Sequence, residues 1–307
     1  MAEYYTLGID GGGTKTEAVI IDELEQVAGV GLGGGSNCSF ITHRAAVDSF
    51  VSAIRAALSS ANLEPSDITC GGCTFGGAAK AAFEEVGIAV EPMPIAEHRV
   101  ALERACITAT SGVVLVAGTG SSCLAFSGED KRTHSGGWGA LLGDEGSAYD
   151  IGLRGIKRAM YAADGRLPAT ALTDAVCEYF QVDRVLGVVK ELLGERIQQA
   201  KVAGFAVKVC ETARAGDEAA LQIIEEAGET LGELIAHTAR RVLSEEDEFP
   251  IVLAGGVFNA GDLIIGPIRC VVAPQFPRAR VLVARMSPGE AAARLARREF
   301  VRRKKEC

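Results

Sequence analysis

A short segment near the start of the sequence, TLGIDGGGTKTEAVIID at residues 6–22, combines two apolar strands with side chains suited to phosphate. Its three successive glycines would let backbone amides approach oxygen atoms closely, and the threonine and lysine that follow add a hydroxyl donor and a cation. The aspartate before them would repel phosphate unless a cation lay between, and Mg²⁺, which takes oxygen ligands and keeps part of its water, removes that conflict. The alternative is a hairpin with a long turn. The candidate residues, which we call the first glycine turn, are Asp10, Gly11, Gly12, Gly13, Thr14 and Lys15.

The segment GVVLVAGTGSSCLAFSGED at residues 112–130 repeats this order of strand, glycine turn and strand. The glycines and hydroxyl side chains of residues 118–122, which we call the second glycine turn, offer another set of amide and hydroxyl donors. Two such turns facing each other across a cleft would hold a triphosphate from both sides. Further along, LAGGVF ends a buried strand with two glycines, as the close approach of a ring or of backbone requires. The candidate residues here are Gly118, Thr119, Gly120, Ser121, Ser122, Gly255 and Gly256.

The elements that would position these turns follow from hydrophobic periodicity. Before residue 112 the pattern predicts three strands, a helix after Thr42, and then strand, helix, strand and helix. After the second hairpin it predicts a glycine-rich loop, a long helical region, two strands and a final helix capped by Ser287. We therefore expect an α/β protein with two similar domains, the second carrying a helical insertion. The expected domains are residues 1–111 with 288–307, and residues 112–287.

Composition limits the classes of function. The chain of 307 residues carries a net charge of −9, which argues against general nucleic-acid binding. No apolar run reaches the roughly 20 residues that cross a bilayer, so we expect no membrane partner. The first residues lack the features of a secretory signal, and nine scattered cysteines, the close pair Cys70 and Cys73 among them, are typical of reduced thiols. A cytoplasmic protein is therefore expected.

Four segments in order, GIDGGGTKTEAVI, AGTGSSC, GGWGALLGDEGSAYDIG and LAGGVF, resemble the N-acetylglucosamine kinase and BadF/BadG/BcrA/BcrD group of the actin–hexokinase ATPase superfamily. The resemblance covers nearly the whole chain. It implies two ribonuclease-H-like domains of the actin-like ATPase fold, with ATP and Mg²⁺ in a cleft between them. It also implies a homodimer.

The resemblance assigns roles to particular residues. It implies ATP contacts at Thr14, Thr119 and Ala203, and a magnesium-binding aspartate at Asp10. The sugar contacts that the resemblance implies are Asn37, Gly137, Trp138, Gly139 and Asp144, with Glu145 beside them. Several of these also have a purely structural interpretation: Asn37 as a turn residue, Asp144 or Ser147 as a helix cap, and Trp138 as a core residue.

The sequence departs from this family at one position. Where the family has an aspartate that takes the proton from the attacking hydroxyl, the segment EHRVALERA has Glu97. Either Glu97 is the base on a longer arm, or His98 takes part, or sugar phosphorylation is weak. Glu97 could also be an ordinary acidic residue at the start of a helix.

The sequence thus predicts an ATP-dependent kinase that phosphorylates an amino sugar, N-acetylglucosamine or glucosamine, at the 6-hydroxyl. Two alternatives remain. One is an iron–sulfur activator ATPase of a CoA-linked dehydratase or reductase, although the cysteines of the second half do not stand in the glycine-flanked setting expected for such a cluster. The other is a sugar-binding relative whose catalysis is weakened.

Overall fold

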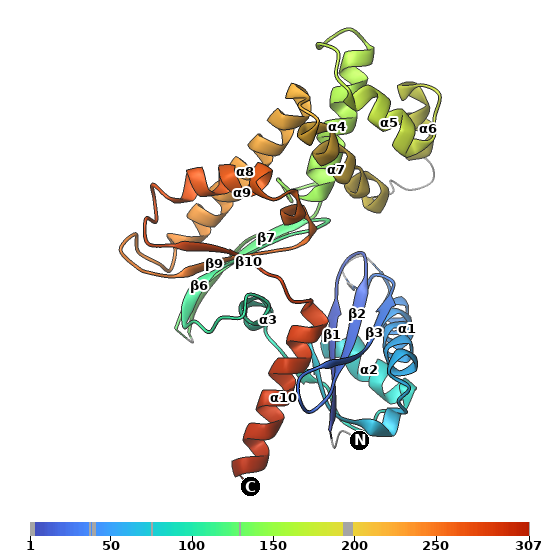
Figure 1. Cartoon of the computed structure of the whole chain (residues 1–307), viewed down its shortest axis with the longest axis vertical. Helices are drawn as coiled ribbons and strands as arrows, with labels where there is room; N and C mark the ends of the chain where they lie inside the picture. The colour runs from blue at the N-terminus through green and yellow to red at the C-terminus, as the bar shows by residue number, and fades with distance from the viewer. Residues whose placement is uncertain are drawn as a thin grey trace. The chain divides into compact units, whose positions relative to one another are not determined.

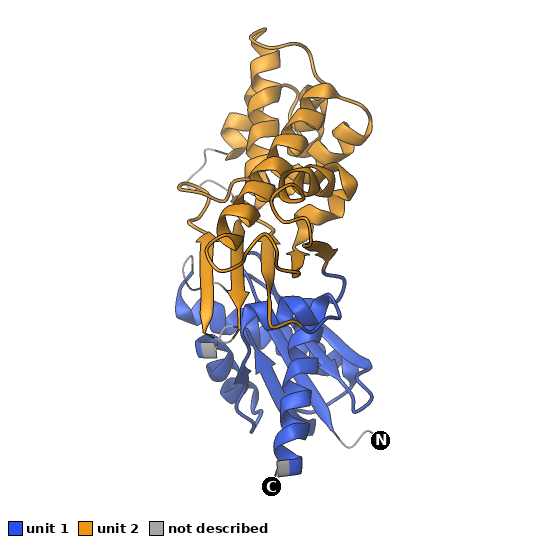
Figure 2. Ribbon diagram, turned by 90° about the vertical axis from the view of Figure 1, so that its left-hand side faces the viewer, with its two compact units in different colours: residues 1–108, 284–307 blue, residues 109–283 orange. Residues whose placement is uncertain are grey.

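The computed structural model describes residues 4–36, 38, 41–74, 76–128, 130–192 and 199–306. The chain divides into two compact units, coloured separately in Figure 2. The first is Met1–Thr108 with Ala284–Cys307, and the second is Ala109–Val283. The sequence had suggested breaks at 111/112 and 287/288. None of the described helices is long and apolar enough to cross a membrane.

The first unit is built on a five-stranded sheet in the order β3-β2-β1-β4-β5. The first three strands form an antiparallel meander, and β4 and β5 continue it parallel to β1. Every residue of β2 is buried, because helices cover both faces of the sheet. The strands are β1 (Tyr5–Gly11), β2 (Thr16–Ile21), β3 (Val27–Gly33), β4 (Ile68–Cys73) and β5 (Met93–Pro94).

Helices α1 (His43–Ala61) and α2 (Gly76–Val86) pack on one face of this sheet, and α3 (Glu97–Arg104) and α10 (Pro288–Glu306) pack on the other (Figure 1). The predicted order of strands and helices up to α3 is confirmed. The helix predicted after Thr42 is α1, and the Thr42 side chain caps it by accepting from the Ala45 amide.

Helix α10 lies directly on β1. A Cβ at Gly8 would overlap the Gly289 carbonyl oxygen and the backbone of Ala293, so only glycine permits this approach. The Ser287 hydroxyl accepts from the Glu290 amide at 3.2 Å, which is the predicted cap of this helix.

Two cysteines of β4 are buried in the first unit. Burial raises the pKa of Cys70 to about 11 and that of Cys73 to about 11. A thiol with so high a pKa is a poor nucleophile and metal ligand at neutral pH, so these residues act as small apolar side chains in the core.

The second unit repeats the connections of the first. Its sheet has the order β10-β9-β6-β7-β8, again with three antiparallel strands followed by two parallel ones. Strand β8 occupies the first residues of the segment that was expected to be a glycine-rich loop. It was not predicted, because KRTHSG has no apolar residue to indicate an edge strand. The strands are β6 (Ser111–Ala117), β7 (Ser121–Ser127), β8 (Lys131–Gly136), β9 (Pro250–Ala254) and β10 (Arg280–Val283).

Helices enclose one large core in the second unit, which includes Leu115 of β6, Phe205 and Ile235. The expected helical region is confirmed, and α9, which follows β9, was not anticipated. The helices are α4 (Ala148–Ala163), α5 (Leu172–Phe180), α6 (Val188–Leu192), α7 (Gln199–Arg214), α8 (Glu218–Ala239) and α9 (Asp262–Val272).

Candidate functional site

The first glycine turn joins β1 to β2. The Gly12 amide donates to the Lys15 carbonyl oxygen at 2.9 Å, which closes the turn. The Ser36 amide donates to the Gly12 carbonyl oxygen at 2.8 Å, so the chain after β3 supports the turn from behind. Asn37, the next residue, lies outside the described part of the chain.

The glycines of this turn differ in what surrounds them. A Cβ at Gly11 would overlap the Ser36 hydroxyl, so internal packing already requires glycine there. A Cβ at Gly13 would have no other atom within 4 Å, and the backbone at Gly13 is not left-handed. Neither packing nor backbone conformation therefore explains Gly13, whereas the close approach of a ligand would.

Asp10 stands at the start of the turn, and several charged residues of the first unit affect its pKa. The Thr74 hydroxyl donates to Asp10 Oδ1 at 2.9 Å. The pKa of Asp10 is raised from 3.8 to about 6, mainly by burial. The hydrogen bond from Thr74 and the positive charge of Arg104 lower this pKa but do not outweigh burial. The carboxylates of Glu17 and Glu97 add to the rise.

Glu97 is thus close enough to Asp10 for the charge of one carboxylate to affect the pKa of the other. Glu97 is the first residue of α3 and its side chain is exposed, while His98 behind it is only 9% exposed. Its position in the first helical turn also fits the simpler interpretation of an acid that suits the helix dipole.

Sequence reasoning missed two charged residues of this site, Glu17 and Arg104. Glu17 is 8% exposed within an otherwise apolar strand, and its carboxylate accepts from the Gly289 amide at 3.0 Å. A charged residue inside such a strand was the available signal. Lys15 is 63% exposed and its ammonium lies 3.9 Å from Glu17, so its side chain remains accessible to an anion.

The second glycine turn joins β6 to β7 and meets the start of α4. The Gly118 amide donates to the Gly120 carbonyl oxygen at 2.9 Å, and the Gly118 carbonyl oxygen accepts from the Ala148 amide at 2.8 Å. A Cβ at Gly120 would overlap the Asp144 carboxylate, whereas a Cβ at Gly118 would meet nothing within 4 Å. This turn therefore has the same contrast between a packed glycine and an open one.

The two glycines after β9 repeat that contrast. Gly255 has a φ of 122°, and a Cβ there would overlap the carbonyl oxygen of Ala117, at the end of β6. At Gly256 a Cβ would have open space around it.

The loop before α4 brings several predicted sugar-site residues to the second glycine turn. The Gly137 amide donates to the Ser121 carbonyl oxygen at 2.8 Å, and the Ser121 hydroxyl donates to the Glu145 carbonyl oxygen at 2.8 Å. Asp144 is 8% exposed and takes a φ of 63°, a left-handed conformation that aspartate tolerates. Ser147 caps α4 by accepting from the Asp150 amide, so Asp144 is not the cap of that helix.

Two of the remaining predicted residues lie in this loop, and a third lies on α7. Trp138 is 73% exposed, so it is not a core residue, and Gly139 beside it has a φ of 85°. Ala203 is 7% exposed on α7, which packs against α4 so closely that a Cβ at Gly152 would overlap the Val202 carbonyl oxygen.

The described residues contain no group of three or more His, Cys, Asp or Glu side chains that could hold a metal ion. Mg²⁺, however, commonly uses one or two carboxylates and takes its remaining ligands from water and substrate phosphate. The partly buried Asp10 carboxylate beside an open turn fits that kind of site.

Comparison with known proteins gives the family. The model of the BadF/BadG/BcrA/BcrD ATPase family matches residues 7–292. The chain belongs to this family. An N-acetyl-D-glucosamine kinase of Dictyostelium discoideum is 27% identical over 314 residues, which cover 96% of this chain and 98% of the relative. A glucosamine kinase of Vibrio cholerae is 28% identical over 230 residues, covering 72% of this chain and 76% of that protein.

Solved structures agree with the fold expected of this family. A protein of Chromobacterium violaceum proposed to be an N-acetylglucosamine kinase is 25% identical, with a TM-score of 0.69 over 95% of this chain and 99% of that one. A ROK family glucokinase of Streptomyces griseus has a TM-score of 0.63 at 18% identity, with 96% and 99% covered, and shows likeness of fold alone. The predicted α/β class and actin-like ATPase fold are confirmed.

Proposed function

We propose that this protein transfers the γ-phosphoryl group of ATP to the 6-hydroxyl of an amino sugar, N-acetylglucosamine or glucosamine. The reaction class rests on membership of the family and on relatives that phosphorylate these sugars. The structural observation that carries the proposal is that each of the three glycine-containing strand ends has an open glycine, Gly13, Gly118 or Gly256, whose identity neither packing nor backbone conformation explains. A bound nucleotide at these positions would explain all three.

The two glycine turns would bind the phosphates of ATP. Backbone amides of the first turn, with the exposed side chains of Thr14 and Lys15, would donate to phosphate oxygens. Amides of the second turn and the Thr119 hydroxyl would bind in the same manner, and Gly255, Gly256 and Ala203 would line the adenosine.

Asp10 would hold Mg²⁺. The bound ion would supply positive charge that offsets the charge developing on the transferred phosphoryl group. The Asp10 carboxylate is partly buried, the charges of Glu17 and Glu97 raise its pKa, and Thr74 is its hydrogen-bond donor. A cation at Asp10 would therefore relieve repulsion among the three carboxylates.

The amino sugar would lie against the loop before α4. Asp144 would accept from a sugar hydroxyl, with its position fixed by burial and by the left-handed backbone. Gly137, Trp138, Gly139 and Glu145 would complete the loop's contacts, and Asn37 would bind a hydroxyl or the amide of the sugar. The exposed Trp138 side chain is free to pack on a sugar face.

Glu97 would act as the general base. The sugar O6 forms a bond to the γ-phosphorus, the bond from that phosphorus to the β–γ bridging oxygen breaks, and ADP leaves. The proton of the 6-hydroxyl passes to the Glu97 carboxylate. Proximity of Glu97 to the charge of Asp10 supports this assignment.

We also infer that the protein forms a homodimer, on the strength of the family resemblance, and that it acts in the cytoplasm, where its nine scattered cysteines would stay reduced. The net charge of −9 supports the absence of nucleic-acid partners.

The deciding experiment is a coupled ADP-release assay over a panel of hexoses and amino sugars, with ATP and Mg²⁺ and a control without sugar. ADP release that depends on an amino sugar is the expected result, and a 6-deoxy analogue should not be phosphorylated. ADP release at the same rate without sugar would contradict the proposal and favour an ATPase instead.

A further inference from the structure

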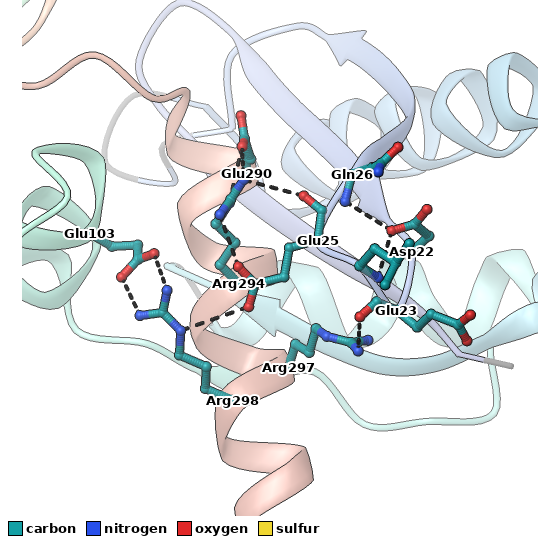
Figure 3. A network of polar contacts seen from close by, with 10 residues as sticks. Asp22, Glu23, Glu25, Gln26, Glu103, Glu290, Arg294, Arg297 and Arg298 are labelled. Atoms are coloured by element: carbon teal, nitrogen blue, oxygen red, sulfur yellow. Dashed lines mark hydrogen bonds and ion pairs between the residues drawn. The ribbon is translucent and has the colours of Figure 1, made fainter. Parts of the chain in front are cut away.

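The C-terminal end of α3 is bound to α10 by a paired ion contact (Figure 3). The two terminal nitrogens of Arg298 donate to the two carboxylate oxygens of Glu103 at 2.7 and 2.8 Å. The Glu103 side chain is 9% exposed, so the pair is half enclosed and its geometry is bidentate. This contact therefore fixes both the distance and the orientation between the two helices.

A second contact binds the next residue of α3 to the chain just before α10. The Arg104 carbonyl oxygen accepts from the Arg285 amide at 2.9 Å and from the Met286 amide at 3.2 Å. The Arg104 Nε donates to the Met286 carbonyl oxygen at 2.8 Å. Two successive residues at one end of α3 are thus tied to residues 285–298.

The other end of α3 carries Glu97. The helix has eight residues, and the six residue steps from Glu97 to Glu103 correspond to about 9 Å along the axis. A rigid helix of this length converts a tilt at its anchored end into a displacement of Glu97, and proton transfer depends on placement within fractions of an ångström. The Glu103 anchor is therefore mechanically linked to the proposed base.

The same helix α10 offers a matched comparison. One turn before Arg298, Arg294 pairs with Glu25 at 2.9 Å and with Glu290 at 2.9 Å, and Arg297 donates to the Glu23 carbonyl oxygen. The contacts with Glu25 and Glu23 join α10 to the turn between β2 and β3, the Glu290 contact lies within α10, and none of them involves α3 (Figure 3). Arg298 also lies 3.8 Å from Glu25, so Glu103 is the partner that distinguishes Arg298 from Arg294. Like the Glu103 contact, the contacts with Glu25 and Glu23 are made by arginines of α10, but they bind α10 to the β2–β3 turn and not to α3.

We propose that Glu103 and Arg298 are positioning residues for catalysis, which hold α3 so that the Glu97 carboxylate meets the substrate hydroxyl. This inference rests on the proposed kinase function and on Glu97 as its base. The competing explanation is that the pair only fastens α10 to the first unit, in which case the Arg294 contacts would serve the same purpose equally well.

Two substitutions in α10, Arg298→Met and Arg294→Met, distinguish these explanations. Both variants are assayed at a temperature at which thermal unfolding curves show that they are folded. We expect Arg298→Met to lower kcat about 10-fold to 100-fold with the KM for ATP within twofold of the wild type. We expect Arg294→Met to leave kcat within twofold. Equal losses of kcat in both variants, or no loss in Arg298→Met, would overturn the inference.

Two further variants guard against a general loss of structure. Arg298→Lys keeps the charge without the bidentate fork and should recover part of the lost kcat. The exchanged pair Glu103→Arg with Arg298→Glu should recover more activity than either single change. Failure of both to recover any activity would also count against a positioning role.

Hydrogen–deuterium exchange of the wild type and the two methionine variants gives a readout that is independent of turnover. Amides of residues 97–104 should exchange faster in Arg298→Met than in the wild type, and at the wild-type rate in Arg294→Met. If the wild type phosphorylates no sugar, the proposed function fails, and with it the catalytic part of this inference. Unchanged exchange in Arg298→Met would refute the anchoring itself, whatever the enzyme does.

Discussion

The Thr74 hydroxyl donates to the Asp10 carboxylate at 2.9 Å, across the ends of two parallel strands, β4 and β1. This bond favours the ionised carboxylate, yet burial and the neighbouring carboxylates prevail, and the pKa of Asp10 rises to about 6. Without a bound cation, the first unit would therefore hold a costly negative charge at neutral pH, at the position where Mg²⁺ is proposed to bind.

That cost gives the first prediction, on stability. Because the pKa of Asp10 in the folded state lies above its ordinary 3.8, Asp10 favours folding most below about pH 4, and its contribution declines as the pH rises through about 6. At pH 7, Asp10→Asn should raise the free energy of unfolding by roughly 1–3 kcal/mol. Urea unfolding at pH 4 and pH 7 measures this, with little gain expected at pH 4; a variant less stable than the wild type at pH 7 would contradict it.

The same shift predicts a pH dependence of metal binding. Protonation of Asp10 removes a proposed Mg²⁺ ligand, so affinity for Mg²⁺ with a non-hydrolysable ATP analogue should fall as the pH drops through about 6. Calorimetric titration at pH 5.5 and 7.5 tests this. Asp10→Asn should show weak binding at both values, and equal affinity of the wild type at both would refute the assignment.

Substitution by alanine should have different effects at the two glycines Gly11 and Gly13, on stability at the first and on ATP binding at the second. Gly13→Ala adds a methyl group to open space, so its unfolding midpoint should match the wild type while ATP binding weakens at least tenfold. Gly11→Ala places the methyl group against Ser36 and should destabilise the fold by roughly 1–3 kcal/mol. Thermal unfolding and nucleotide titration of both variants test this, and unchanged ATP affinity in Gly13→Ala would remove the first turn from the nucleotide site.

Glu97 is tested by two substitutions of different kinds. Glu97→Gln keeps the size and removes the base, so kcat should fall about 100-fold or more. Glu97→Asp keeps the base on a shorter arm and should retain more activity than Glu97→Gln. Steady-state kinetics with the preferred sugar measure both, and a Glu97→Gln variant with full kcat would show that Glu97 is not the base.

Asp144 should affect the sugar rather than the nucleotide. Asn tolerates the left-handed backbone at this position, so Asp144→Asn should fold normally. The KM for sugar should rise about tenfold, since a strong acceptor for a sugar hydroxyl is weakened, while the KM for ATP stays within twofold. A rise confined to the KM for ATP would instead place Asp144 beside the nucleotide.

The sequence was sufficient for much of the fold, because strands such as β1 and β2 are mostly apolar and are joined by a glycine turn. Strand β8 was missed because an edge strand needs little apolar surface and its segment KRTHSG has none. The expected glycine turns formed where their motifs stood, since strand pairing fixes a hairpin locally.

The charged surroundings of Asp10 could be predicted only in part. Glu17 stands opposite Asp10 in the β1–β2 hairpin, whereas only the folded unit, with α3 on the face of its sheet, brings the charge of Arg104 to Asp10. The pairing of Glu103 with Arg298, 195 residues away, is likewise a property of tertiary packing that no local pattern contains.

The placement of α10 also has a consequence for synthesis on the ribosome. Val19 and Ile21 of β2 are covered by Ala293 of α10, and translation reaches this helix only after the whole of residues 109–283. At about 5–20 residues per second, the first sheet waits roughly 10 to 35 seconds with the part of its face that α10 covers still exposed. During that interval the nascent chain presents a surface on which chaperones bind and neighbouring polypeptides aggregate.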